Sequence, residues 1–353
     1  MKPPSIKDIA QALGISIGTV DRALHSRSDI SLSTRARVLK TAEELGYRPN
    51  IAARSLKLNR RLRIGVYFPK EIASFFDVLR SGVRAAAAAS TGVNVELVFR
   101  TFPRLDEGDL ELLKADTNEK LDGILITPGN PDHIGPTLND LARRGVAVLC
   151  VASDAPRTER IASVTADAHA SGAIAAELFS RTIHKPGQLA TFAGDLTTLD
   201  HAEKLRGFAA NLAVFAPHLS LLPAMESHEK PAVAHRQASA LLSRKPYPLG
   251  MYVSTANSLP ILRALEEKGL LGEIQVITTD LFAELLPYIE SGKVLATLYQ
   301  RPFAQGKTAL ELLLRFLVQG TSPDVTTRLA PHIILRSNLS LFTSYLEERE
   351  EEN

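Results

Sequence analysis

Residues 6–24 read IKDIAQALGISIGTVDRAL, and their apolar side chains recur at the spacing of two short helices. Gly14 ends the first helix, because a left-handed backbone conformation costs glycine little. Ser16 is placed to cap the second helix, residues 17–24, whose inner face carries Val20, Ala23 and Leu24. Two short helices joined by a tight turn that contains glycine predict a helix-turn-helix.

A third helix is predicted directly after this pair. Ser33 caps residues 34–45, and Gly46 ends the helix. Its core-facing stripe consists of Val38, Leu39, Ala42 and Leu45. Three small helices around one core are typical of a DNA-reading module.

The charge of the chain is unevenly distributed. Residues 1–61 hold 12 Lys and Arg against 5 Asp and Glu, which gives 12 − 5 = +7, whereas the rest holds 29 against 34, or −5. A basic head on a mildly acidic body indicates that the head holds a polyanion. The alternative is a basic terminus that is simply solvated.

The composition of the chain is that of an ordinary globular protein. A chain of 353 residues exceeds one core, so two or three domains are expected, and 45% hydrophobic residues argue against long disorder. The single cysteine, Cys150, lies in an apolar run and is expected to be a buried strand thiol. No signal peptide and no membrane-length apolar run are recognisable, so we expect a cytoplasmic protein.

From Arg63 onward strands alternate with helices, a pattern that predicts parallel sheets covered by helices on both faces. A first set has strands at 64–68, 93–100, 123–126 and 147–151, with helices at 76–89, 110–120 and 138–144. A second set has strands at 189–192, 251–253 and 275–278, with helices at 201–215, 232–243 and 259–268. The fold class is therefore α/β, and two facing sheets leave a ligand cleft at their strand ends.

The head resembles that of the lactose-repressor (LacI) family. The resemblance rests on residues 6–16, Thr19-Val20, Arg22 and Gly46-Tyr-Arg-Pro-Asn50, while Ala52-Ala-Arg-Ser-Leu-Lys57 is similar to the family's hinge helix. The body is similar to the two-lobed domain of type I periplasmic sugar-binding proteins that this family carries. The chain is thus expected to cross between lobes near 164–168, 295–299 and 327–331.

The resemblance implies a division of the chain into four parts. Residues 1–49 are the helix-turn-helix head, 50–61 the hinge helix and linker, 62–346 the effector-binding and dimerisation domain, and 347–353 an acidic tail. Within the domain, the first lobe comprises 62–165 and 297–328, and the second lobe 166–296 and 329–346.

By the same resemblance the second helix enters the DNA major groove. Ile17 and Gly18 occupy the positions that choose bases, and Arg22 the position that reaches a guanine edge. Ile17 and Gly18 both differ from the polar residues that many members of the family carry at these two positions. Phosphate contact or helix capping is expected of Ser5, Ser16, Thr19 and Thr34.

In the hinge, Leu56 resembles the apolar wedge that this family inserts into the minor groove. The alternative is a small hydrophobic contact on a linker helix. The neighbouring DNA-binding positions are Asn50, Ala53, Arg54 and Lys57. Because short isolated helices are marginal in water, the hinge is expected to fold only when paired with a second copy on DNA.

The resemblance also places candidate effector-binding residues at the strand ends. Phe75 and Phe76 resemble an aromatic pair that stacks on the apolar face of a sugar ring, although core packing is the alternative for one of them. Acidic, basic and amide groups are implied at Asp154, Lys204, Arg206, Asn257, Asp280 and Gln300. Lysine stands at 204 where arginine is usual, Arg206 is its competitor, and the acid that usually follows Asn257 is a serine.

These residues predict a DNA-binding repressor that forms a homodimer on a pseudo-palindromic operator and responds to a sugar or sugar derivative. No catalytic constellation, metal-ligand spacing or cofactor motif is recognisable, and neither is a membrane partner. Two alternatives remain: a corepressor-type regulator that responds to a purine or another metabolite, and an α/β enzyme with an accessory DNA-binding head.

Overall fold

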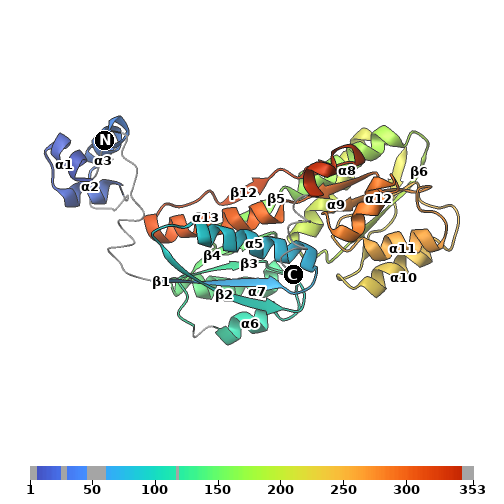
Figure 1. Ribbon diagram of the computed structural model, residues 1–353, viewed down its shortest axis with the longest axis horizontal. Coiled ribbons are helices and arrows are strands. Elements are labelled where there is room, and N and C mark those ends of the chain that lie inside the picture. Colours follow the sequence, from blue (N-terminus) through green and yellow to red (C-terminus); the bar gives the residue numbers. More distant parts are fainter. Residues whose placement is uncertain (1–5, 25–29, 46–60, 117–118, 344–353) are drawn as a thin grey trace.

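The computed structural model describes residues 6–24, 30–45, 61–116 and 119–343. Its N-terminal part contains three helices, α1 (Ile6–Leu13), α2 (Ile17–Leu24) and α3 (Leu32–Glu44), which surround one small core (Figure 1). The buried residues of this core are Ile9, Ala10, Val20, Ala23, Val38 and Ala42. Gly14 has φ +63, as its role at the end of α1 requires. The predicted helix-turn-helix is confirmed.

Two details of the predicted third helix are wrong. The helix begins at Leu32, and the Ser31 hydroxyl, not Ser33, accepts the Thr34 N–H at 3.2 Å. Leu39 and Leu45 are 46% and 40% exposed instead of facing the core. Successive residues of a helix are rotated by about 100°, so Leu39 points away from the core because Val38 already points into it. Leu45 is exposed because it follows the last residue of the helix.

The body contains two sheets, as expected for the α/β class (Figure 1). The first has the order β12-β5-β4-β3-β1-β2 and is parallel throughout. Its strands are β1 (Arg61–Pro69), β2 (Asn94–Phe102), β3 (Gly123–Ile126), β4 (Ala147–Val151), β5 (Ala162–Ala166) and β12 (Thr326–Leu329). Helices α5 (Ala73–Ala89) and α13 (Pro302–Gln319) pack on one face, and α6 (Asp109–Ala115) and α7 (Pro131–Arg143) pack on the other. Cys150 is buried in β4, as predicted.

The second sheet has the order β13-β11-β10-β9-β6-β7, with β8 also pairing to β6. Only the pairing of β13 with β11 is antiparallel within the described sheet. The strands are β6 (Gly187–Ala193), β7 (Leu219–Leu221), β8 (Met225–Glu226), β9 (Gly250–Val253), β10 (Gln275–Thr279), β11 (Ala296–Tyr299) and β13 (His332–Ile334). Helices α8 (Ala168–Thr182) and α9 (Leu199–Phe215) cover one face, and α10 (Pro231–Leu241) and α11 (Leu259–Glu267) the other. Short helical turns follow at η2 (Ala283–Leu285), α12 (Leu286–Glu290) and η3 (Arg336–Asn338).

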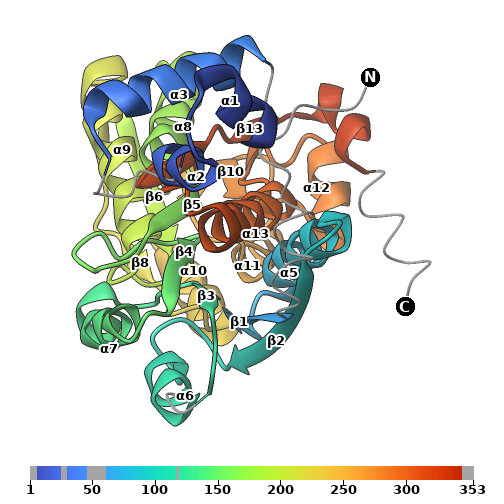
Figure 2. The same cartoon turned by 90° about the vertical axis from the view of Figure 1, so that its left-hand side faces the viewer.

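Glycines allow close packing of the helix pairs that flank the sheets. A Cβ atom on Gly172 of α8 would lie 2.0 Å from the Lys204 carbonyl oxygen of α9, so a side chain there would push the helices apart. Helices α5 and α13 lie side by side in the first lobe for the same reason, with Gly306 against Leu79 (Figure 2). The position of α9, which carries three residues of the site described below, is thereby set by contact with α8.

The chain passes between the sheets after β5, after β11 and after β12. Strand β11 belongs to the second sheet, where Thr297 and Leu298 pair with Thr278 and Thr279. The predicted start of the returning first lobe at 297 is therefore too early, since that segment completes the second sheet before α13 begins at Pro302.

Candidate functional site between the lobes

A small cavity of about 40 Å³ lies where the two sheets face each other. The first lobe lines it with apolar side chains and two hydroxyls, from Ile72, Phe75, Phe76, Leu105, Thr127 and Ser153. The second lobe lines it mainly with charged and polar groups, from Thr198, Asp200, His201, Lys204, Glu229, Thr255 and Asp280. One wall is thus apolar and the other ionic, which suits a ligand that has both an apolar face and hydrogen-bonding groups.

The structure brings five of the eight candidate effector-binding residues to this cavity: Phe75, Phe76, Lys204, Asp280 and Gln300. The two phenylalanine rings lie 5.0 Å apart in an edge-on arrangement with an interplanar angle of 81°. Both also pack in the core of the first lobe. The two phenylalanines therefore line the cavity and pack in the core at the same time.

Asp280 directly follows strand β10, and it accepts hydrogen bonds from Gln300 at the crossing to the first lobe. Its carboxylate accepts the Gln300 backbone N–H at 3.0 Å and the Gln300 Nε2–H at 2.6 Å. Gln300 in turn accepts a bond from Gln305 Nε2 at 2.8 Å, through its carbonyl oxygen. Burial raises the pKa of Asp280 to about 6, although the nearby Lys204 lowers it.

Lys204 is 1% exposed and donates to Asp200 Oδ2 at 2.6 Å. The two residues are four apart on α9, so they share one face of that helix. A buried ammonium group requires such a counter-charge, because an isolated buried charge is costly. Asp200 Oδ1, by contrast, has no partner among the described residues.

Two hydroxyl oxygens in the cavity wall, Thr127 Oγ1 and Ser153 Oγ, are likewise buried without a hydrogen-bond partner in the described part of the chain. Their residues are 1% and 2% exposed. Since buried polar atoms normally have partners, both atoms are available to a molecule between the lobes.

Glu229 and Thr255 in this cavity were not predicted from the sequence. Glu229 accepts from the Thr255 hydroxyl at 2.8 and 2.7 Å, and His201 Nε2 lies 3.5 Å from its Oε1. Burial raises the pKa of Glu229. Glu229 follows the two-residue strand β8 and has φ +54, so no periodic pattern marks it in the sequence. His201 also lines the cavity and is 7% exposed.

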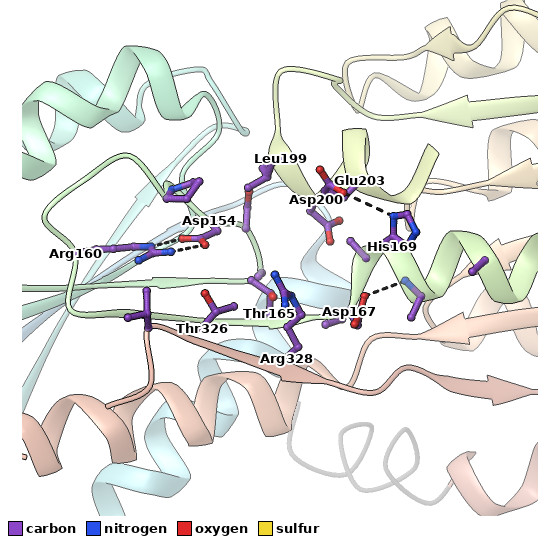
Figure 3. Close-up of a pocket in the computed structure, with 18 of the residues that line it drawn as sticks. Asp154, Arg160, Thr165, Asp167, His169, Leu199, Asp200, Glu203, Thr326 and Arg328 are labelled. Atoms are coloured by element: carbon purple, nitrogen blue, oxygen red, sulfur yellow. Dashed lines mark hydrogen bonds and ion pairs between the residues drawn. The ribbon is translucent and has the colours of Figure 1, made fainter. Parts of the chain in front are cut away.

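Asp154 lies outside the small cavity, in a wider opening of about 880 Å³ beside the crossing strands (Figure 3). There Arg160 holds its carboxylate, with Nη2 2.6 Å from Oδ2 and a second bond from Nε. The carboxylate of this candidate effector-binding residue is thus paired with the guanidinium group of Arg160, six residues later in the chain.

Arg206 and Asn257 are not brought to the cavity either. The Arg206 side chain is 66% exposed and pairs with Glu203, because it lies two residues after Lys204 and so points to another face of α9. Asn257 lines a third opening of about 270 Å³, next to Glu71 and Glu284.

In the N-terminal head, Ser16 caps α2, since its hydroxyl accepts the Thr19 N–H at 3.0 Å. The Thr34 hydroxyl lies 2.8 Å from Ser31 Oγ. Ile17 is 48% exposed at the start of α2, and Gly18 and Arg22 follow on the same helix. The remaining candidates, Ser5, Asn50, Ala53, Arg54, Leu56 and Lys57, lie outside the described residues.

The structure brings together one group with metal-ligand chemistry that spacing could not reveal: Asp195, Glu226 and His228. Asp195 already accepts bonds from Thr197 and pairs with His228 at 2.9 Å, and Glu226 accepts the Leu196 N–H at 2.8 Å. These protein partners account for the cluster, and we assign no metal to it. None of the helices in the described residues has the length and apolar character to cross a membrane.

Comparison with known proteins matches both parts of the chain to protein families. Residues 5–50 match the lacI family of bacterial regulatory proteins, and residues 64–321 match the periplasmic binding protein domain family. Catabolite control protein A of Priestia megaterium is 26% identical over 94% of this chain and 97% of its own length. The transcriptional repressor PurR of Aliivibrio fischeri (strain MJ11) is 25% identical over 95% and 98%.

Solved structures agree on the fold of the body. GanP, a glucose-galactose binding protein from Geobacillus stearothermophilus, superposes with a TM-score of 0.72 at 23% identity, over 79% of this chain and 99% of its own. The Caulobacter myo-inositol binding protein superposes with a TM-score of 0.72 at 22% identity, over 81% and 97%.

Proposed function

The chain belongs to the lacI family of bacterial regulatory proteins, with a periplasmic binding protein domain as its body, and we propose that it is a repressor controlled by a sugar or sugar derivative bound between the lobes. Its role as a DNA-binding transcriptional regulator follows from that membership. The effector, the direction of its effect and the oligomeric state belong to the proposal. So does the place of action, the bacterial cytoplasm, where the operator is.

The composition of the cavity wall carries the proposal. A sugar ring has an apolar C–H face and a rim of hydroxyls, which match the Phe75-Phe76 wall and the carboxylates of Asp200 and Asp280. The unpartnered Thr127 and Ser153 hydroxyls add two more hydrogen-bonding groups on the first-lobe side. The glucose-galactose binding protein GanP and the Caulobacter myo-inositol binding protein, which share the fold of the body, support the same class of ligand.

A purine-type effector is less well supported. A flat base binds best between parallel apolar faces, whereas the two rings here meet at 81° and the opposite wall is charged. An enzymatic role is also less well supported, because the charged groups of the cavity already have hydrogen-bond partners within the protein. Lys204 bonds to Asp200, and Asp280 and Glu229 accept hydrogen bonds from Gln300 and Thr255, respectively.

Ligand control requires the lobes to move. The cavity of about 40 Å³ is far below the roughly 300 Å³ of ordinary small-molecule pockets, so the effector must bind to a more open arrangement. The Thr198 hydroxyl donates to the Gly129 carbonyl oxygen at 2.9 Å across the lobes and favours closure. We propose that this opening and closing changes the spacing of paired hinge segments in a homodimer and thereby its operator affinity.

A thermal-shift screen of purified full-length protein over hexoses, pentoses, polyols, sugar phosphates and purines tests this proposal. Stabilisation by sugars or polyols, with loss of the shift in Asp280→Ala, is the expected result. Stabilisation by purines alone would overturn the sugar assignment, and consumption of any stabilising compound would support the enzyme instead.

A further inference from the structure

The cleft between the lobes is lined by more acidic than basic groups. Around the small cavity Asp200, Glu229 and Asp280 face a single ammonium group, that of Lys204. The adjoining opening adds Glu71 from the first lobe and Glu284 from the second, and its lining contains no lysine or arginine. Glu71 itself pairs with Arg104 at 2.8 Å, which leaves the excess on the second lobe.

Of these buried acids, Glu229 is the one with neither a lysine or arginine partner nor a hydrogen bond from an amide group among the described residues. Lys204 pairs with Asp200, and Asp280 accepts two bonds from Gln300. Glu229, which is 4% exposed, contacts the Thr255 hydroxyl and the His201 ring at 3.5 Å.

The His201 ring lies between Glu229 and the backbone of Asp195. Its Nδ1 accepts the Asp195 N–H at 3.0 Å, and this leaves the Nε2 proton directed at Glu229. The same Nδ1 lies 3.1 Å from the Asp195 carbonyl oxygen. A buried carboxylate whose contacts are one hydroxyl group and the edge of an imidazole ring favours a cation beside it.

A second observation points to a ligand at the same place. The unpartnered Thr127 and Ser153 hydroxyl oxygens, 1% and 2% exposed on the first lobe, line the cavity that Glu229 lines from the second lobe. A molecule that satisfies both walls needs hydroxyl groups as well as positive charge.

We infer that the effector is an amine-bearing sugar, whose ammonium group binds Glu229 and whose hydroxyl groups bind Thr127, Ser153 and Asp200. This inference rests on the proposed function and narrows its ligand class. Phosphorylated sugars and sugar acids are disfavoured, because they would bring further negative charge to a cleft with an acidic excess. An N-acetylated amino sugar loses the cation and should bind like the parent sugar.

Calorimetric titration of the wild-type full chain tests the inference with matched ligands. The probes are glucosamine, galactosamine and mannosamine, each with its parent hexose, its N-acetyl form and its 6-phosphate. We expect at least one amine to bind about tenfold tighter than its parent and its N-acetyl form, with no binding of the phosphate.

Glu229→Gln should weaken binding of that amine by about tenfold and change the affinity for the parent hexose by less than about threefold. Glu284→Gln removes an exposed carboxylate from the same opening and is the matched control, expected to change either affinity by less than about twofold. Because the wild-type comparison needs no variant, a poorly folded Glu229→Gln protein would not prevent the test.

The outcomes separate this inference from the proposed function. Equal binding of hexoses and amines, or tighter binding of phosphates, overturns the amine assignment and leaves a sugar effector in place. Binding of none of these compounds counts against the sugar-responsive function and, with it, against the amine.

Discussion

Replacement of Asp280 by asparagine should change the pH dependence of stability in a calculable way. The Asp280 carboxyl is 3% exposed, and burial raises its pKa from 3.8 to about 6. An acid whose pKa is higher in the folded than in the unfolded protein costs no stability below the unfolded pKa. It destabilises the fold progressively as the pH rises toward the folded pKa.

The full cost of ionisation, reached above pH 6, is about 3 kcal/mol for a shift of this size. The neutral amide of the Asp280→Asn variant resembles the protonated acid at every pH, so the variant avoids this cost. Between pH 5 and pH 7 the free energy of unfolding of Asp280→Asn should therefore rise relative to wild type by about 1 kcal/mol. In a lobe of this size that corresponds to a relative gain in melting temperature of roughly 2–4 °C.

Thermal unfolding of both proteins at pH 5, 6 and 7 without ligand measures this difference. Glu284→Gln, which removes an exposed carboxylate of the same lobe, is the control and should show a change of less than about 1 °C relative to wild type. A difference between wild type and Asp280→Asn that stays constant over this pH range, or that moves in the opposite direction, would refute the reasoning on Asp280.

Three further predictions concern the buried ion pair, the contact across the lobes and the hinge. Lys204→Met should lower the free energy of unfolding by about 3 kcal/mol, since it leaves Asp200 unpaired, and adding Asp200→Asn should restore part of it in urea titrations. Thr198→Val removes the bond to Gly129 and should weaken effector binding by about fivefold in calorimetry, with an unchanged affinity contradicting a role in closure. Leu56→Ala should weaken specific operator binding by at least about tenfold in a gel-shift titration and leave effector affinity unchanged; equal operator binding would sink the wedge assignment.

The parts that could be predicted from the sequence follow from local periodicity and from strand topology. Apolar spacing predicts α1, α2 and the alternating elements, and parallel strands bring their carboxyl ends to one edge. Asp280 and Gln300 lie at such strand ends and do meet in the cavity.

Contacts made by loops could not be predicted in the same way. Glu229 reaches the cavity through β8, a strand of two residues, and a positive φ. Asp154 stands at a strand end as expected, but the following loop turns back and places Arg160 against it. Whether a polar residue at a strand end is free to bind a ligand depends on such loop conformations, which leave no periodic signal.

Exposure on α3 was mispredicted for a related reason. Leu39 and Leu45 are apolar at roughly helical spacing, yet the small core is already filled by Val38 and Ala42 together with residues of α1 and α2. In a module this small, the number of core positions is lower than the number of apolar residues that could occupy them.

The proposed function requires a small molecule between the lobes to control DNA binding. Fluorescence anisotropy of a labelled duplex, selected from random DNA by the wild-type protein, measures operator affinity with and without each sugar that stabilises the protein. We expect one such sugar to weaken operator binding at least about tenfold in wild type and to have no effect in Asp280→Ala, which should bind DNA normally. Operator affinity that is unchanged by every bound sugar, or an Asp280→Ala protein that responds at the same concentration as wild type, would contradict it.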